Sequence, residues 1–210
     1  MERHRDVPFW LCVGDVATAD GKYEALPVPL HWIKGNNENF DAIAANAFPH
    51  NLHYIPNAHA VTIGSPEGLD YERAIVVAGL GGTLAPTMYE LTAAELPHPR
   101  KSSAKATEQA DRRRHFVREE VDACKSMKGV DIFMSHEAPR PFRVHRGIDA
   151  GKTPINDILQ TMKPRLHLFG HHHKFVEGTA QGVPSLCLDL VSRSYLLVDA
   201  KTLVYRHLPS

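Results

Sequence analysis

The sequence lacks any long hydrophobic run. Its apolar stretches are interrupted within about ten residues, whereas a helix that crosses a membrane needs about 20 apolar residues. The first six residues, MERHRD, also lack the apolar centre of a signal peptide. We therefore expect a cytoplasmic protein without a membrane partner.

Net charge and cysteine are also scarce. The 24 Lys and Arg residues balance 24 Asp and Glu residues, so no overall field attracts nucleic acid or an anionic membrane. There are 3 cysteines, Cys12, Cys124 and Cys187, and the first and last stand in apolar runs. Buried reduced thiols fit this pattern better than a disulfide framework.

The chain has enough apolar residues for one domain. Its 210 residues, of which 43% are hydrophobic, predict a single domain over 1–210. Apolar runs typical of strands occur at 9–15, 30–36, 59–64, 74–80, 130–136, 165–170, 175–176, 185–190, 194–198 and 202–207. Helical patterns cover 39–47, 106–128 and 154–162, and the segment 83–105 predicts a surface loop or insertion. This order predicts a mixed α/β fold, with a layered sheet core flanked by helices.

Four of these strands end in residues that can bind a metal ion. They are Asp15, Asn36, His136 and the pair His171 and His173. Open α/β sheets gather functional groups at the carboxyl ends of their strands, so we expect these side chains to converge. Carboxylate oxygen and imidazole nitrogen suit divalent Zn, Mn, Fe, Ni or Co ions, and no cysteine stands beside them for a thiolate zinc site.

Each of these residues also has a plainer interpretation. The histidine run 171–173 could be an exposed turn that binds metal only incidentally, and His136 taken alone fits a hydrogen-bonded core histidine. Asp15 and the pair 36–37 could be simple turn formers. Arg112–Arg114 is interpreted as the solvated face of the 106–128 helix, with an RNA or phosphate contact as the alternative. The ordered set of strand ends favours the metal site.

The same residues resemble the ordered motifs of calcineurin-like metallophosphoesterases, which are Asp-x-His, Gly-Asp, Gly-Asn-His-Asp/Glu, a lone His and Gly-His-x-His. Four of the five have counterparts in order, at Gly14-Asp15, Gly35-Asn36-Asn37-Glu38, Ser135-His136 and Gly170-His171-His172-His173. Within that family, the segments 131–140, 163–164 and 174–175 look most like those of RNA lariat debranching enzymes. The resemblance extends over residues 8–208.

The resemblance implies a layered β-sheet sandwich of four layers, αββα, around a metal site. Asp15 would bridge two metals, Asn36, His136 and His171 would complete the second, and His173 would reach the first. One or two divalent ions per chain would activate a water molecule that attacks phosphorus in a phosphodiester or phosphomonoester.

Two departures from the family pattern lower the expected activity. Asn37 stands where the family usually has a catalytic His, and its amide can hydrogen-bond a phosphate but cannot donate a proton at neutral pH. No Asp-x-His occurs in the chain, so the strand–helix unit that should carry it would precede residue 8. Either the sequence starts late or the first-metal ligands are lost. The alternative function is a catalytically impaired scaffold or a nucleic-acid-associated binding protein.

The remaining expectations concern the substrate and partners. Catalytic roles fall to Asn37 and His136, and substrate contacts to Asn37, Arg140, Arg143 and His172. The substrate is a phosphoester, and both nucleotides and RNA are compatible with it. A sheet that lacks one strand has unpaired edges, so we also expect a homo-oligomer that covers them.

Overall fold

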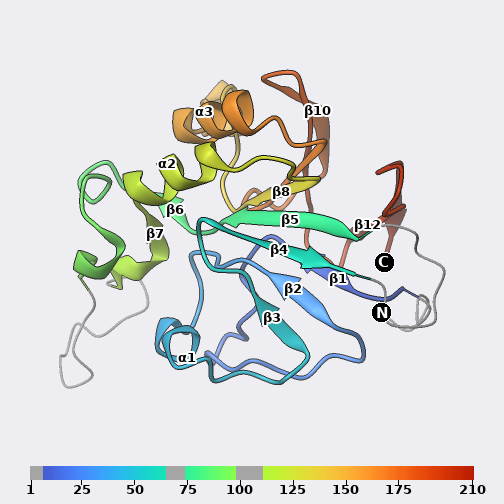
Figure 1. Cartoon of the computed structure of the whole chain (residues 1–210), viewed down its shortest axis with the longest axis horizontal. Coiled ribbons are helices and arrows are strands. Elements are labelled where there is room, and N and C mark those ends of the chain that lie inside the picture. Colours follow the sequence, from blue (N-terminus) through green and yellow to red (C-terminus); the bar gives the residue numbers. More distant parts are fainter. Residues whose placement is uncertain (1–6, 65–73, 98–110) are drawn as a thin grey trace.

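A mixed six-stranded sheet forms the centre of the protein (Figure 1). The structure is a computed structural model, and it describes residues 7–64, 74–97 and 111–210. In spatial order the strands are β10 (Val176–Ala180), β11 (Val183–Cys187), β9 (Leu166–Phe169), β8 (Ile132–Ser135), β5 (Ile75–Leu80) and β4 (His59–Ile63). The four inner strands are parallel, and the two outer strands run antiparallel to their neighbours. The inner strands therefore end at the same edge of the sheet.

A second, smaller sheet packs against the first. It consists of the parallel strands β1 (Trp10–Cys12), β2 (Leu30–Trp32) and β3 (Leu52–Tyr54). An apolar cluster lies between the two sheets and joins Val13, Ile33 and Ile55 to Val77 and Met134. This burial fixes how the ends of β1 and β2 lie relative to the ends of β5, β8 and β9.

Two helices cover the outer face of the six-stranded sheet, and a short helix lies beside the three-stranded sheet (Figure 1). The helices α2 (Arg118–Ser126) and α3 (Thr153–Met162) pack on the six-stranded sheet through Val121, Cys124, Ile155 and Ile158. The short helix α1 (Phe40–Ala44) lies beside the three-stranded sheet, where Ile43 joins the cluster around Trp32. The order of layers is helix, sheet, sheet, helix, which confirms the expected four-layer α/β architecture.

Two strand pairs lie outside these sheets. The hairpin β12 (Ser194–Val198) and β13 (Tyr205–Pro209) turns at Asp199, whose carboxylate accepts hydrogen bonds from the backbone of Lys201 and Thr202. The strands β6 (Thr83–Leu84) and β7 (His115–Phe116) form a short parallel pair beyond the carboxyl end of β5. In the described parts of the chain, no helix is long and apolar enough to span a bilayer.

Most of the expected elements are confirmed, but the helix predicted over 106–128 is wrong at its start. Residues 106–110 lie outside the described residues, and α2 begins only at Arg118. Arg112–Arg114 forms a 3-10 turn, capped by the Asp111 side chain, which accepts from Arg113 N. Pairing of β7 with β6 then keeps the backbone extended, so a tertiary contact overrides the helical pattern. The interpretation of Arg112–Arg114 as a helix face is therefore corrected.

Smaller differences arise where local signals are weak. Strand β3 has only three residues, too few for a recognisable alternation. Asn39 caps α1 as expected, because its side chain accepts from Ala42 N, but the helix ends at Ala44 rather than at residue 47. Of the predicted loop 83–105, residues 98–105 lie outside the described residues. The cysteines are free, and two of them, Cys124 and Cys187, are buried.

Candidate metal centre

The predicted ligands lie at the carboxyl ends of four strands from the two packed sheets. Asp15 follows β1, Asn36 follows β2, His136 follows β8 and His171 follows β9. Close backbone packing brings the first two together, since a Cβ atom on Gly35 would lie 2.0 Å from Asp15 Oδ1. Only glycine fits at that position.

His136 is at the centre of the cluster. It is 1% exposed, and its Nε2 atom lies 2.9 Å from Asn36 Oδ1, 3.1 Å from His171 Nδ1 and 3.8 Å from Asp15 Oδ2. Its other ring nitrogen, Nδ1, lies 2.8 Å from the carbonyl oxygen of Val13. Side chains that are 100 residues apart in the sequence therefore meet at one imidazole nitrogen.

Acceptor atoms gather around His136 Nε2, and His171 Nδ1 can donate to it in one of its tautomers. Burial lowers the pKa of His136, so its imidazole is neutral and carries one proton. The Val13 carbonyl can only accept, which places that proton on Nδ1 and leaves a lone pair on Nε2. Asn36 Oδ1 and Asp15 Oδ2 are also acceptors, so lone pairs from three side chains face one another. A metal-binding histidine has this same second hydrogen bond, which fixes its tautomer.

Asp15 is held in place by its neighbours in the second motif. Its carboxylate accepts from Asn37 N at 2.8 Å and from Asn37 Nδ2 at 3.3 Å. Buried Glu38 accepts from the backbone of Val16, Ala17 and Gly35. The two loops after β1 and β2 are thus tied together by both residues, which fixes Asp15 against Asn36.

Three of the predicted ligands have left-handed backbone conformations. The φ angles are 61° at Asp15, 67° at His171 and 48° at His173. Such angles are unfavourable for residues other than glycine and are found where the surrounding structure enforces them, often at functional sites. The chain therefore changes direction sharply at these three residues, just after the strands that carry them.

His173 lies apart from the tight cluster. It is exposed, and its side chain makes no hydrogen bond within the described chain. It nevertheless lines the same groove as Asp15, His136 and His171. The structure therefore places His173 near the site but not against the other ligands.

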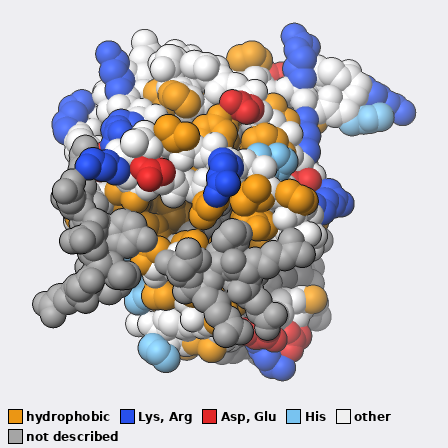
Figure 2. All heavy atoms as spheres, turned by 90° about the vertical axis from the view of Figure 1, so that its right-hand side faces the viewer, with side chains coloured by type: hydrophobic (Ala, Val, Ile, Leu, Met, Phe, Trp, Pro, Cys, Tyr) orange, Lys and Arg blue, Asp and Glu red, His pale blue; other side chains and the backbone are white. Residues whose placement is uncertain are grey.

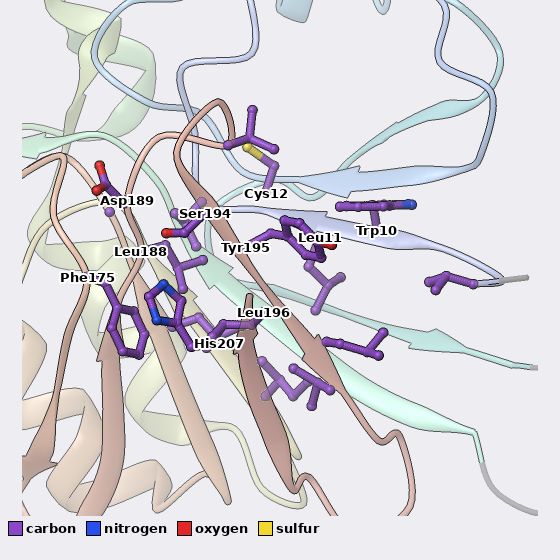
Figure 3. A pocket seen from close by; sticks show the side chains of 18 of the residues that line it. Trp10, Leu11, Cys12, Phe175, Leu188, Asp189, Ser194, Tyr195, Leu196 and His207 are labelled. Carbon is purple, nitrogen blue, oxygen red and sulfur yellow. The ribbon is translucent and has the colours of Figure 1, made fainter. Parts of the chain in front are cut away.

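Asp15 and His173 line an apolar groove. Trp10 and Leu11 of β1 and Tyr195 and Leu196 of β12 also line it (Figure 3). Its volume is about 670 Å³, and the consecutive residues 7–15 and 194–200 line it from two sides. Consecutive residues line a groove when a strand presents its backbone edge, and β1 and β12 are edge strands in the described structure. Hydrophobic side chains also gather on this face of the molecule (Figure 2).

The predicted substrate residues have different surroundings. His172 packs on Phe142 with ring centroids 4.6 Å apart, and its Nε2 is buried without a partner among the described residues. Arg140 forms an ion pair with Asp149 at 2.8 Å. Arg143 is exposed and donates to the carbonyl of Gly147. Of the two arginines, Arg143 is the one without a carboxylate partner in the part of the chain that the structure describes.

Comparison with known proteins identifies the family of the chain. A model of the calcineurin-like phosphoesterase family matches residues 3–175, most of the chain. The protein belongs to the calcineurin-like phosphoesterase family. Members of this family hydrolyse phosphoesters with divalent metal ions, which is the chemistry expected from the motifs. A search of curated proteins gave no match.

Solved structures similar to this calcineurin-like phosphoesterase are distant in sequence. One is TT1561 of Thermus thermophilus, with 14% identity, coverage of 87% of this chain and 72% of that one, and a TM-score of 0.49. A second crystal structure has 12% identity, coverage of 87% and 66%, and a TM-score of 0.54. The second likeness shows the shared fold alone.

The donor atoms of this phosphoesterase fit a divalent ion through a mixed set of ligands. Among the residues that the structure describes, no group of three or more His, Cys, Asp or Glu side chains is arranged to hold a metal ion. The cluster gains a third member only through the amide oxygen of Asn36, beside His136 and His171. Imidazole nitrogen and amide or carboxylate oxygen are ligands that suit borderline divalent ions.

Lys34 has a role near the site that the sequence did not reveal. It is buried, and its Nζ donates to the carbonyls of Arg113 at 2.9 Å and His115 at 3.1 Å. Glu38 ties together the loops after β1 and β2. Its only signal in the sequence was its place in the motif Gly35-Asn36-Asn37-Glu38. A lysine inside an apolar strand was the available signal for Lys34, since such a charge needs buried partners.

Proposed function

We propose that this protein is a metal-dependent phosphoesterase whose metal site contains Asn36, His136 and His171, with Asp15 beside them. The observation that carries the proposal is the neutral, buried His136, whose unprotonated Nε2 faces two acceptor oxygens within 4 Å. His171 Nδ1 can donate to this nitrogen in one tautomer, whereas a cation can be bound by the nitrogen and the oxygens together. A divalent cation is the partner that satisfies all of them.

When bound, a divalent ion lowers the pKa of water toward neutrality and stabilises charge on the phosphate oxygens. The chain's own groups have separate tasks. The Val13 carbonyl holds His136 in the tautomer that leaves Nε2 free, and Asn37 keeps the Asp15 carboxylate turned toward the site. The side-chain amide of Asn37 is a hydrogen-bond donor and not an acid, so esters with good leaving groups are favoured.

The proposed substrates are phosphodiesters or phosphomonoesters. The resemblance of residues 131–140 to lariat debranching enzymes supports RNA phosphodiesters as the first natural substrates to test. A catalytically impaired scaffold is the second candidate, and it is favoured by Asn37 standing where the family usually has a histidine. Mn²⁺-dependent turnover distinguishes the two.

The test compares wild type, His136→Ala and His50→Ala with a bis-aryl phosphate and Mn²⁺. His50 is an exposed histidine outside the cluster and serves as the matched control. We expect His136→Ala to lower kcat/KM by about a thousandfold, because a metal contributes several kcal/mol to transition-state stabilisation. His50→Ala should match wild type. No Mn²⁺-dependent turnover in wild type, or equal turnover in all three proteins, would favour the scaffold.

A further inference from the structure

A segment from outside the metal motifs is fastened beside the candidate site. Residues 111–116 cross the carboxyl edge of the six-stranded sheet, where β7 pairs with β6 just after the end of β5. Lys34, which directly precedes Gly35 and Asn36, donates to the carbonyls on both sides of Arg114. The backbone of Arg114 is thereby fixed to the strand that carries the metal ligand Asn36.

The three consecutive arginines of this segment have different surroundings. Arg113 is engaged in the structure itself, with ion pairs to Asp111 and Asp41. Arg112 is exposed to solvent. Arg114 is half-buried, and its guanidinium has no hydrogen bond or ion pair within the described residues. A half-buried arginine without an anion is unfavourable. Of the three arginines, Arg114 is therefore the one best placed to bind an additional anion.

The backbone of Arg114 lies close to the candidate site. A Cβ atom on Gly82 would lie 2.5 Å from Arg114 O, and Leu80, two residues before Gly82, accepts a hydrogen bond from His136 N. Lys174 Nζ lies 4.5 Å from the centre of the Phe142 ring, on which His172 also packs.

We propose that Arg114 binds the phosphoryl oxygens of the substrate at the candidate metal centre. The proposal rests on the proposed phosphoesterase function and adds a residue that lies outside the metal motifs. A planar guanidinium suits this role because it offers paired N–H donors to two oxygens of one phosphate. The hydrogen bonds from Lys34 fix the backbone of Arg114. Its side chain has no carboxylate partner among the described residues, so a phosphate would not have to displace one.

The experiment measures binding of inorganic phosphate to the Mn²⁺-loaded protein by calorimetry. Wild type is compared with Arg114→Ala, Arg114→Lys and the matched control Arg112→Ala. We expect Arg114→Ala to weaken phosphate binding about tenfold, Arg114→Lys to restore part of it, and Arg112→Ala to change it by less than about twofold. Because the Arg114 side chain has no described partner, all variants should keep the thermal midpoint of wild type.

Two results would overturn the proposal. One is phosphate binding by Arg114→Ala equal to that of wild type at equal manganese content. The other is equal weakening by Arg112→Ala, which would mean a diffuse charge effect. If Arg114→Ala fails to fold, Arg114→Gln, which keeps most of the side-chain length, decides in the same assay. Failure of the phosphoesterase function itself would appear separately, as absence of Mn²⁺-dependent turnover in wild type.

Discussion

The two halves of the candidate metal centre differ in how completely the fold prepares them. Asn36, His136 and His171 are packed together, with distances of 2.9 Å and 3.1 Å to one imidazole nitrogen. Asp15 lies 3.8 Å from that nitrogen, and His173 is exposed at the mouth of an apolar groove. One half is organised by burial between two sheets, whereas the other half is bordered by strands β1 and β12, whose edges are open in the described structure.

Strand ends alone therefore do not make a complete site. The tight half draws on strands that have neighbours on both sides, so their ends are fixed in position. In the open half, Asp15 follows β1, which has only one neighbour in its sheet among the described residues, and His173 lies two residues beyond His171 in the turn after β9. We therefore expect one strongly held metal ion and a second position of low affinity.

The largest effect should separate the two histidines of the Gly170 motif. We expect His171→Ala to lower the affinity for Mn²⁺ about a hundredfold and His173→Ala by less than about tenfold, because only His171 contacts His136. Isothermal titration with Mn²⁺ measures both affinities. Equal losses in the two variants would remove the proposed contrast between the two halves.

A smaller effect is expected from restoring a proton donor. Asn37→His should raise kcat about tenfold on an ester with a poor leaving group, since an imidazole can donate the proton that an amide cannot. Asn37→Ala is the control, because it removes the side-chain hydrogen bond to Asp15 without adding an acid. Steady-state kinetics of both variants make the comparison. A histidine variant no faster than the alanine variant would show that proton transfer does not limit turnover.

The smallest effect concerns the open edges. We propose that a second copy of the chain covers β1 and β12, as unpaired edges bordered by apolar side chains favour association. Leu197 on β12 lines the groove, so Leu197→Lys should shift a dimer toward monomer by about tenfold in Kd. Light scattering with size-exclusion chromatography measures this shift. A wild-type protein that stays monomeric at high concentration would contradict the proposal.

Much of the layered fold was predictable from the sequence, because runs such as Val130 to His136 combine an apolar strand with a polar end. The same property made the tight half of the site predictable, since parallel strands must end at one edge. A phosphate contact of Arg112–Arg114 was an alternative in the sequence, but which of the three arginines has no anionic partner, and the role of Lys34, depend on the pairing of β7 with β6 and had no local signal. That pairing replaced a helix that the local pattern favoured. The wider separation of His173 depends on the tertiary arrangement around the groove and also has no local signal.

A shared cation at the strand ends can be observed directly in a crystal of the protein soaked in Mn²⁺ and measured at the manganese absorption edge. We predict one strong anomalous peak at about 2.2 Å from His136 Nε2, Asn36 Oδ1 and His171 Nδ1. A weaker second peak would lie toward Asp15 and His173. A map without a peak at His136 Nε2, from crystals that hold manganese elsewhere, would show that these strand ends do not share a cation.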